Sequence, residues 1–414
     1  MKKLLLTLIL TTLTLTLTAC EYDWAHQNPQ YLQDFNYLLQ ALEENFPYFG
    51  IAERRFGISL EQITENTRQA ITAQPIRDTY HFISILNANF FAPMRSIGHL
   101  SIQDRGILHL ILGNIYRGSL DFNGIPIDLR GYEHTYWGQK FIDMTRSETA
   151  QQFYGFIEVA EGYEPGMVRQ NNLTTQIIGE NIGYVRVSQF WHYNIDHDLE
   201  IMLDFYQQIQ GFDNLIIDLR GNGGGMVRYF TQIFMAPIIP HDVEIPGIYN
   251  LLKAGSRNLA WVNAQIMTDY IFMQADTQKV PLPAYRFPYL ADAHKFGYML
   301  QSPIHVASTG QQLFDGKIWI LVDHNSASAV EFAVMYAQSI NFATIVGTPT
   351  RGVTGGGLAG FFPLPNTGII IRYDYGFFVD SYGRAIDEHG VTPDHLNHTG
   401  MDALQTTLTL IQQQ

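Results

Sequence analysis

The chain has 414 residues, of which 46% are hydrophobic and 15% charged, a composition typical of a folded globular protein. Its 39 acidic residues outnumber its 25 lysines and arginines, and the formal net charge of −14 argues against a nucleic acid as partner. Cys20 is the only cysteine, so the sequence excludes an intramolecular disulfide, a cysteine nucleophile and a cysteine-based zinc site.

The first 20 residues have the pattern of a targeting segment. Lys2 and Lys3 precede an apolar, threonine-rich stretch that is short for a membrane-spanning helix. The stretch closes with Leu17-Thr18-Ala19-Cys20, which resembles a bacterial lipobox. This resemblance implies that residues 1–19 are a signal peptide and that Cys20 carries lipid. We therefore expect a lipid-anchored protein of the cell envelope, on the periplasmic or outer side of a bacterial membrane.

Residues 20–98 carry three helical patterns. Apolar residues recur at helical spacing over residues 29–46, Ser59 and Gln62 form a predicted capping box for a helix that reaches Ile71, and a third helix is predicted over residues 78–90. Pro93 ends this third pattern. An intermediate region follows at residues 99–180, where His99 precedes a strand-like segment and no PDZ domain is recognisable.

From residue 181 to the C-terminus, predicted strands and helices alternate. A strand at 183–187, a helix at 199–209 and a strand at 214–219 predict a parallel crossover. Further strands are predicted at 317–322, 343–346 and 368–373, and further helices at 329–337 and 402–411. Residues 237–312 contain several prolines and no clear period, and we interpret them as an insertion over the core. This order favours an α/β core.

Two turns of this predicted core have chemical potential. The segment His324 to Glu331 lies between a buried strand and a helix, where a serine would gain the helix dipole and the free amides of the first turn. Ser326 and Ser328 could equally cap that helix. Gly223, Gly224 and Gly225 follow another buried strand and could present backbone amides to a carbonyl. They lack the Gly-Lys-Ser/Thr ending of a phosphate-binding loop.

Four motifs together resemble the serine peptidase family of C-terminal processing proteases and tricorn core enzymes. They are an Asp-x-Arg-x-Asn-Gly-Gly-Gly block at 218–225, a Ser-Ala-Ser-x-x-Glu turn at 326–331, a Gly-x-x-Thr-x-Gly pattern in the loop from 347, and Gly-Val-x-Pro-Asp at 390–394. The resemblance spans roughly residues 181–394. It implies an α/β (α+β) fold with a crotonase/ClpP-like ββα core and an N-terminal helical domain.

The resemblance also assigns roles to residues. It implies that Ser328 is the nucleophile, with Ser326 as the less favoured candidate, and that the amide of Ala329 and a glycine amide of Gly223 or Gly224 form the oxyanion hole. Val353 stands where one branch of the family has its lysine. The tricorn-like branch uses a histidine and a late glutamate, which correspond here to His99 and Glu388, although Asp387 and Asp394 lie close by.

The sequence therefore predicts a lipid-anchored serine endopeptidase that acts on proteins or peptides without metal or organic cofactor. Two clusters of potential metal ligands, within 388–398 and 192–198, lack the His-Glu-x-x-His spacing. The alternative is a non-catalytic lipoprotein that binds peptides or surface polymers and retains the peptidase fold. An esterase is less favoured because the chain has no Gly-x-Ser-x-Gly elbow at the serine.

Overall fold

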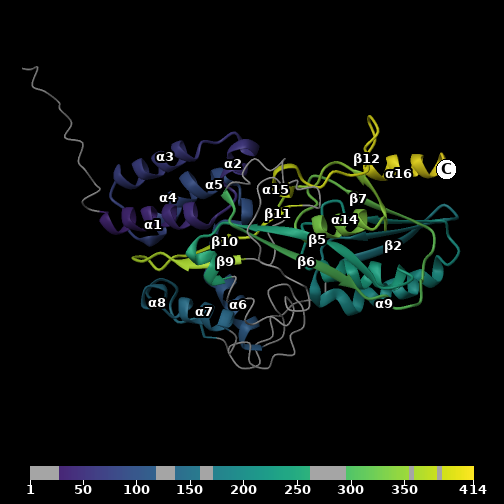
Figure 1. The fold of residues 1–414 in the computed structure, drawn as a ribbon, viewed down its shortest axis with the longest axis horizontal. Helices are drawn as coiled ribbons and strands as arrows, with labels where there is room; N and C mark the ends of the chain where they lie inside the picture. The colour runs from purple at the N-terminus through teal and green to yellow at the C-terminus, as the bar shows by residue number, and fades with distance from the viewer. Residues whose placement is uncertain (1–27, 118–135, 159–170, 262–294, 354–358, 380–384) are drawn as a thin grey trace, which may run out of the picture.

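The computed structural model describes residues 28–117, 136–158, 171–261, 295–353, 359–379 and 385–414. The N-terminal helices lie at one end of the molecule, and a large sheet with the C-terminal helix lies at the other (Figure 1). The predicted signal peptide and Cys20 fall outside the described residues. Among the helices that are described, none combines the length and the apolar character needed to cross a bilayer.

The N-terminal helices follow the predicted pattern with one addition. Helix α1 (Pro29–Asn45) buries the apolar stripe that its spacing predicted, and Ser59 caps α3 (Leu60–Thr72) by accepting a hydrogen bond from the Gln62 amide. The third pattern forms α4 (Thr79–Leu86), which continues as a π-helical turn, η2 (Asn87–Phe91), and ends in α5 (Ala92–Met94). The sequence did not predict the short helix α2 (Phe49–Phe56).

The intermediate region does not form a separate core. It contains η3 (Ile97–His99), β1 (Ser101–Ile102), α6 (Arg105–Arg117), α7 (Tyr136–Thr145) and α8 (Glu148–Tyr154). Strand β1 joins β10 (Ile370–Asp374) and β9 (Ala359–Pro363) in a small antiparallel sheet of order β1-β10-β9. Buried side chains from α1 to α8 and from β9 and β10 form one hydrophobic cluster. Two strands from the C-terminal part of the chain therefore belong to the core of the N-terminal half.

A six-stranded sheet of order β12-β8-β7-β4-β3-β2 forms the other half. The central strands β3, β4, β7 and β8 and the edge strand β12 pair in parallel, and β2 pairs antiparallel. Their bounds are β2 Leu173–Ile178, β3 Ile182–Val187, β4 Asn214–Asp218, β7 Lys317–Val322, β8 Thr344–Gly347 and β12 His395–Leu396.

Alternation along the buried strands assigns helices to the two faces of this sheet. Leu215 and Ile217 of β4 share a core with α9 (Ile195–Gln208) and α14 (Ala329–Ser339). Ile216 points to the opposite face and packs in a cluster with the C-terminal helix α16 (Ala403–Gln412). Helices on both faces explain why these strands are apolar throughout. Three short helical segments, α10 (Val227–Phe230), η6 (Thr231–Met235) and α11 (Ala236–Ile238), follow the glycine turn.

A third sheet, of order β11-β5-β6, connects the two halves. Its strands are β5 (Val243–Leu252), β6 (Tyr298–Val306) and β11 (Phe377–Val379), so the predicted insertion contains a long antiparallel strand pair. Leu251 and Phe377 belong to the N-terminal core, whereas Ile245 and Phe378 belong to the core beneath the six-stranded sheet. One sheet therefore holds both cores together.

Candidate active site

Ser328 stands at the junction of β7 and α14 in a strained backbone conformation. Its φ of 57° and ψ of −121° lie outside the regions that residues with a side chain usually adopt. The Ser328 amide donates to the carbonyl of Val353 (2.9 Å) and to Glu331 Oε2 (3.1 Å). The backbone around this serine is thus held by contacts made beyond its own turn.

The buried carboxylate of Glu331 secures that backbone. It accepts hydrogen bonds from the Thr350 hydroxyl (2.6 Å) and the Gly352 amide (2.7 Å) at Oε1, and from the amides of Val353 (2.9 Å) and Ser328 at Oε2. Burial raises the pKa of Glu331, and these four donors oppose that shift. Glu331 therefore ties the loop at 350–353 to the turn that carries Ser328.

The glycine turn after β4 lies directly against Ser328. Gly224 has a φ of +107°, and a Cβ at this position would come within 2.6 Å of Ser328 Cβ and 3.0 Å of the Ala329 amide nitrogen. Only glycine permits this approach. The Gly224 amide donates to Asn222 Oδ1 (2.9 Å), whereas the amides of Gly223 and Ala329 have no hydrogen-bond partner among the described residues.

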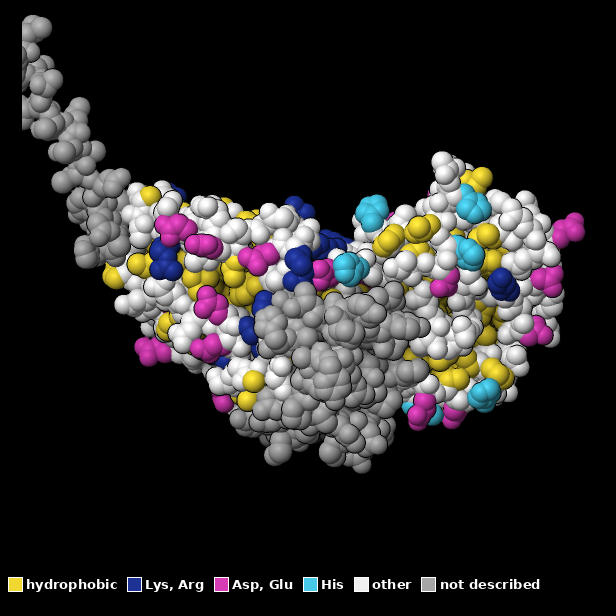
Figure 2. Space-filling view, turned by 45° about the horizontal axis from the view of Figure 1, so that its top comes forward, with side chains coloured by type: hydrophobic (Ala, Val, Ile, Leu, Met, Phe, Trp, Pro, Cys, Tyr) yellow, Lys and Arg dark blue, Asp and Glu magenta, His cyan; other side chains and the backbone are white. Residues whose placement is uncertain are grey.

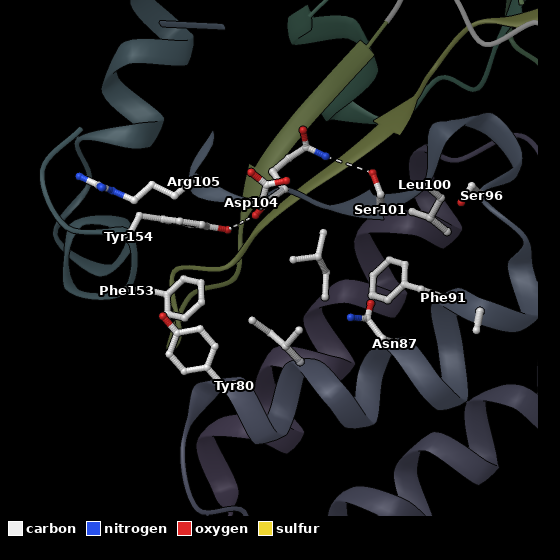
Figure 3. Close-up of a pocket in the computed structure, with 14 residues that line it drawn as sticks. Tyr80, Asn87, Phe91, Ser96, Leu100, Ser101, Asp104, Arg105, Phe153 and Tyr154 are labelled. Carbon is white, nitrogen blue, oxygen red and sulfur yellow. Dashed lines mark hydrogen bonds between the residues drawn. The ribbon is translucent and has the colours of Figure 1, made fainter. Parts of the chain in front are cut away.

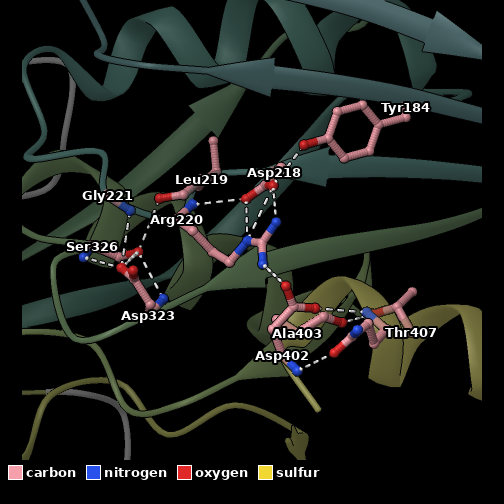
Figure 4. Close-up of polar contacts among 11 residues, drawn as sticks. Tyr184, Asp218, Leu219, Arg220, Gly221, Asp323, Ser326, Asp402, Ala403 and Thr407 are labelled. Atoms are coloured by element: carbon pink, nitrogen blue, oxygen red, sulfur yellow. Dashed lines mark hydrogen bonds and ion pairs between the residues drawn. The ribbon is translucent and has the colours of Figure 1, made fainter.

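An ion-pair network fixes the start of this turn (Figure 4). The guanidinium of Arg220 donates to Asp218 (2.6 Å from Nη2 to Oδ2) and to Asp402 (3.1 Å), and Tyr184 donates to Asp218 from the neighbouring strand (2.7 Å). The hydrogen bond to Asp218 raises the pKa of Arg220, so this cation stays charged. The network leaves Arg220 engaged with two carboxylates and links the turn to the cap of α16.

Ser326 has a different environment from Ser328. It is fully buried, its hydroxyl donates to the carbonyl of Leu219 (2.9 Å) and accepts from the amide of Asp323 (3.0 Å). The bond to Leu219 joins this turn to the turn that follows β4, and the bond from Asp323 lies within the turn of Ser326 itself, as Figure 4 shows. This hydroxyl therefore acts as a structural link.

His99 meets a buried carboxylate that the sequence analysis did not select. Its Nδ1 lies 2.7 Å from Asp374 Oδ2, and the side chains are 29% and 0% exposed respectively. In the β1-β10 pairing Ser101 faces Arg372, so two residues further along the register His99 faces Asp374. An ionised carboxylate only accepts hydrogen bonds, so Nδ1 carries the proton and Nε2 is left as the basic nitrogen.

Glu388, the carboxylate predicted to orient His99, binds a different partner. Arg54 of α2 donates to both of its oxygens, at 2.7 and 2.8 Å. Glu388 lies in the short helix α15 (Ile386–His389), while Asp374 occupies the place beside the imidazole. In this structure the carboxylate that contacts His99 is therefore Asp374, a correction to the sequence-based assignment. The neighbouring Asp387 is buried and Asp394 binds Gln338 and the Ile345 amide.

Helix α2 brings the N-terminal half against the loop behind Ser328. Arg55 donates from Nη1 to the carbonyls of Gly352 and Asp387, both at 2.6 Å, and from Nη2 to the carbonyl of Arg351. Gly352 also donates its amide to Glu331. One guanidinium group thus connects α2 to the loop at 350–353 and to the short helix α15.

A second connection runs through β11. Phe378, four residues after Asp374, packs edge-on against Phe332, four residues after Ser328, with ring centroids 5.1 Å apart.

Figure 2 shows the surface hollowed between the N-terminal helices and the core, with Lys and Arg on the helical side and histidines at its rim. Among the described side chains, Ser328 Oγ and His99 are not joined by a hydrogen bond.

Two of the participating residues carried little signal in the sequence. Asp374 is an aspartate at the end of an apolar strand, and its partner lies 275 positions away, so only the β1-β10 register brings them together. Arg55 lies in a helix too short to show a period. Within the described ranges, no three His, Cys, Asp or Glu side chains gather as the ligands of a metal ion would.

Comparisons with known proteins concern the family and the fold of this chain. The model of peptidase family S41 matches residues 181–396, more than half of the chain. Among solved structures, the chain is similar to a "putative peptidase" from Parabacteroides merdae ATCC 43184 (TM-score 0.52, 15% identity, covering 92% of this chain and 96% of the other). It is also similar to mature CPAF (TM-score 0.52, 14% identity, 89% and 92%). At 15% and 14% sequence identity, these similarities show that the fold is shared and no more than that. No match was found among curated protein sequences.

Proposed function

This chain belongs to peptidase family S41 and is a serine peptidase, and we propose that it is an endopeptidase with Ser328 as nucleophile, His99 as general base and Asp374 as the residue that orients His99. The contact between His99 and a fully buried carboxylate supports the proposal most directly. The strained backbone of Ser328 and the close approach of Gly224 are further support, because the nucleophile must reach the carbon of the same substrate carbonyl whose oxygen the oxyanion donors bind.

In the proposed mechanism, Ser328 Oγ attacks the peptide carbonyl as His99 Nε2 takes its proton. The carbonyl oxygen becomes an oxyanion, which the amides of Ala329 and Gly223 bind, while Gly224 supplies the space for that approach. His99 then passes the proton to the leaving amine, and the acyl-enzyme remains on Ser328. Water, deprotonated by His99, releases the second product. Asp374 holds the tautomer of His99 and stabilises its imidazolium in both the acylation and the deacylation stages.

Hydrolysis of denatured casein by the purified full-length protein tests these roles. We expect Ser328→Ala and His99→Ala each to lower kcat at least about a thousandfold, because nucleophile and base act as one unit. Ser326→Ala is the matched control. Because it keeps Ser328, the folded variant should still hydrolyse casein. Cleavage that persists in Ser328→Ala would contradict the assignment.

The alternative of a non-catalytic binding lipoprotein makes the opposite prediction for covalent labelling. A serine-reactive fluorophosphonate should modify wild type at Ser328 and leave Ser328→Ala unmodified, since only an activated hydroxyl reacts. A protein that merely binds peptides would remain unlabelled in both forms. Labelling therefore separates the two functions even if casein is a poor substrate.

We also propose that Cys20 carries lipid and anchors the enzyme in the cell envelope, as the lipobox-like sequence supports. Growth with an alkyne fatty acid should label the wild-type protein and leave Cys20→Ser unlabelled. Equal labelling of both would remove Cys20 as the modified residue.

A further inference from the structure

A cavity beside β1 has the features of a subsite for an apolar side chain. It has a volume of about 670 Å³, within the range of about 300–1,000 Å³ that is usual for ligand pockets. One wall is β1 with its flanking residues, and the other walls come from α4–η2 and from the end of α8 (Figure 3). The lining includes Leu100, the residue directly after His99.

The rim of this cavity is aromatic, and one of its rings is unusually exposed. Tyr80 is 70% exposed although it is a large hydrophobic residue, and its ring lies 5.4 Å from the ring of Phe153. Phe153 in turn contacts Tyr154 at 4.6 Å. Figure 3 shows these side chains on one side of the cavity and Phe91 and Asn87 on the other. Ile83, Leu100 and Ile102 add to an apolar lining, which favours an apolar group, and the charges of Asp104 and Arg105 are of opposite sign.

The adjacent strand has a free hydrogen-bonding edge. Sheet order β1-β10-β9 places β1 at the edge, and the Gln103 amide donates to the Ile370 carbonyl (2.9 Å). In an antiparallel pair, alternate residues face the partner strand, so the amide and carbonyl of Ile102 point away from β10. Neither group of Ile102 has a hydrogen-bond partner among the described residues. Ile102 also lines the cavity.

From this juxtaposition we propose that the substrate polypeptide adds to the free edge of β1 as an extended strand and places one large apolar side chain in the cavity. Backbone pairing to Ile102 would supply affinity, and the cavity would select the side chain. Ile102 follows His99 by three residues, or about 10 Å at 3.3 Å per residue. The selected side chain therefore belongs about three residues from the bond that is cleaved. The inference rests on the proposed function, because His99 defines where cleavage occurs.

Peptide capture by the inactive enzyme tests this inference. Full-length Ser328→Ala is immobilised and exposed to a peptic digest of casein, and the retained peptides are identified by mass spectrometry. We expect retained peptides to share a Phe, Tyr, Trp or Leu. Adding Asn87→Trp fills the cavity from an exposed position on η2 and should lower retention about tenfold or more. Asn66→Trp, the same change at an exposed position of α3, should leave retention unchanged.

N-methylation separates strand addition from binding by the cavity alone. A retained peptide is synthesised in a series of variants, each with one backbone amide methylated. Methylation of the one or two amides that face Ile102 should lower the affinity of the peptide for the enzyme about tenfold. Equal retention by the Asn87→Trp and Asn66→Trp proteins, retention of no peptide, or tolerance of methylation at every position would each overturn the inference. Failure of the proposed function shows separately, as absence of fluorophosphonate labelling in the wild type. Thermal unfolding of each variant confirms that it is folded.

Discussion

At the scale of single residues, the main finding is that Asp374, rather than Glu388, contacts His99. Asp374 is fully buried and bonded to Nδ1, whereas Glu388 is bonded to Arg54 near the surface. A carboxylate that bonds the imidazole directly stabilises the imidazolium much more than one that binds an arginine elsewhere. The other oxygen of Asp374 lies 3.8 Å from Arg372 Nη2, a looser contact than the one between Glu388 and Arg54. The two carboxylates therefore make separable predictions.

Asp374→Asn is expected to lower kcat for casein cleavage by about a hundredfold to ten-thousandfold, because an amide no longer fixes the tautomer or the charge of His99. The matched change Glu388→Gln should lower kcat by less than about tenfold. Steady-state rates of both variants decide the assignment. A larger loss in Glu388→Gln than in Asp374→Asn would restore Glu388 as the orienting residue.

Glu331 offers a second prediction at this scale. Its two oxygens accept four hydrogen bonds, and Glu331→Gln would set an amide NH₂ against two of the four donors. Each buried donor left without an acceptor costs about 1–3 kcal/mol, so we expect the free energy of unfolding in urea to fall by about 2–4 kcal/mol. The exposed Glu43→Gln should unfold like wild type. An unchanged midpoint for Glu331→Gln would show that the loop at 350–353 does not depend on this carboxylate.

At the scale of elements, the strongly periodic segments behaved as their patterns predicted. Strand β7 occupies the predicted residues 317–322, and α14 begins at Ala329, directly after the strained serine. Helix α2 was not predicted because it has only 8 residues, too few to display a hydrophobic period. Strands β5 and β6 were not predicted because β5 contains a proline and a glycine and its pairing with β6 has an irregular register.

The C-terminal helix provides a prediction about pH. Asp402 caps α16 by accepting from the Gln405 amide (2.8 Å), and this hydrogen bond, together with Arg220, lowers the pKa of Asp402. A lowered carboxyl pKa stabilises the fold above the unfolded value, about 3.9, and that contribution is lost as the pH falls through the folded value. The difference in unfolding free energy between wild type and Asp402→Asn should therefore shrink steadily below about pH 4. A pH-independent difference in urea titrations between pH 3 and 6 would contradict the linkage.

At the scale of the whole molecule, function depends on how the N-terminal half is held against the core. His99 lies two residues before β1 and Asp374 ends β10 of the small sheet in the N-terminal half, whereas Ser328 caps α14, which packs on the large sheet. Contacts from α2 and the β11-β5-β6 sheet determine how these parts lie relative to each other. Changes at these contacts should therefore affect catalysis without touching a reacting group.

Arg55→Met tests this coupling. It keeps much of the alkyl chain but leaves the carbonyls of Gly352 and Asp387 without their donor, which we expect to lower the unfolding free energy by about 1–3 kcal/mol and to lower kcat as well. Arg54→Met is the matched neighbour. Its ion pair with Glu388 is partly exposed, so its loss should cost less than about 1 kcal/mol. Equal effects of the two substitutions on stability and kcat would argue against a special role for Arg55.

The sequence by itself determined the class of the core and the residues of its local turns. Periodicity and short motifs are properties of neighbouring positions, so the strands β3, β4, β7, β8 and β10, the helix α14 and the glycine turn could be predicted from them. Ser328 was singled out by its place in a motif that resembles a peptidase family. The contact of His99 with Asp374, the Arg55 contacts and the cavity beside β1 join positions tens to hundreds of residues apart. Such contacts depend on strand register and on the packing of two halves, which only the tertiary structure decides.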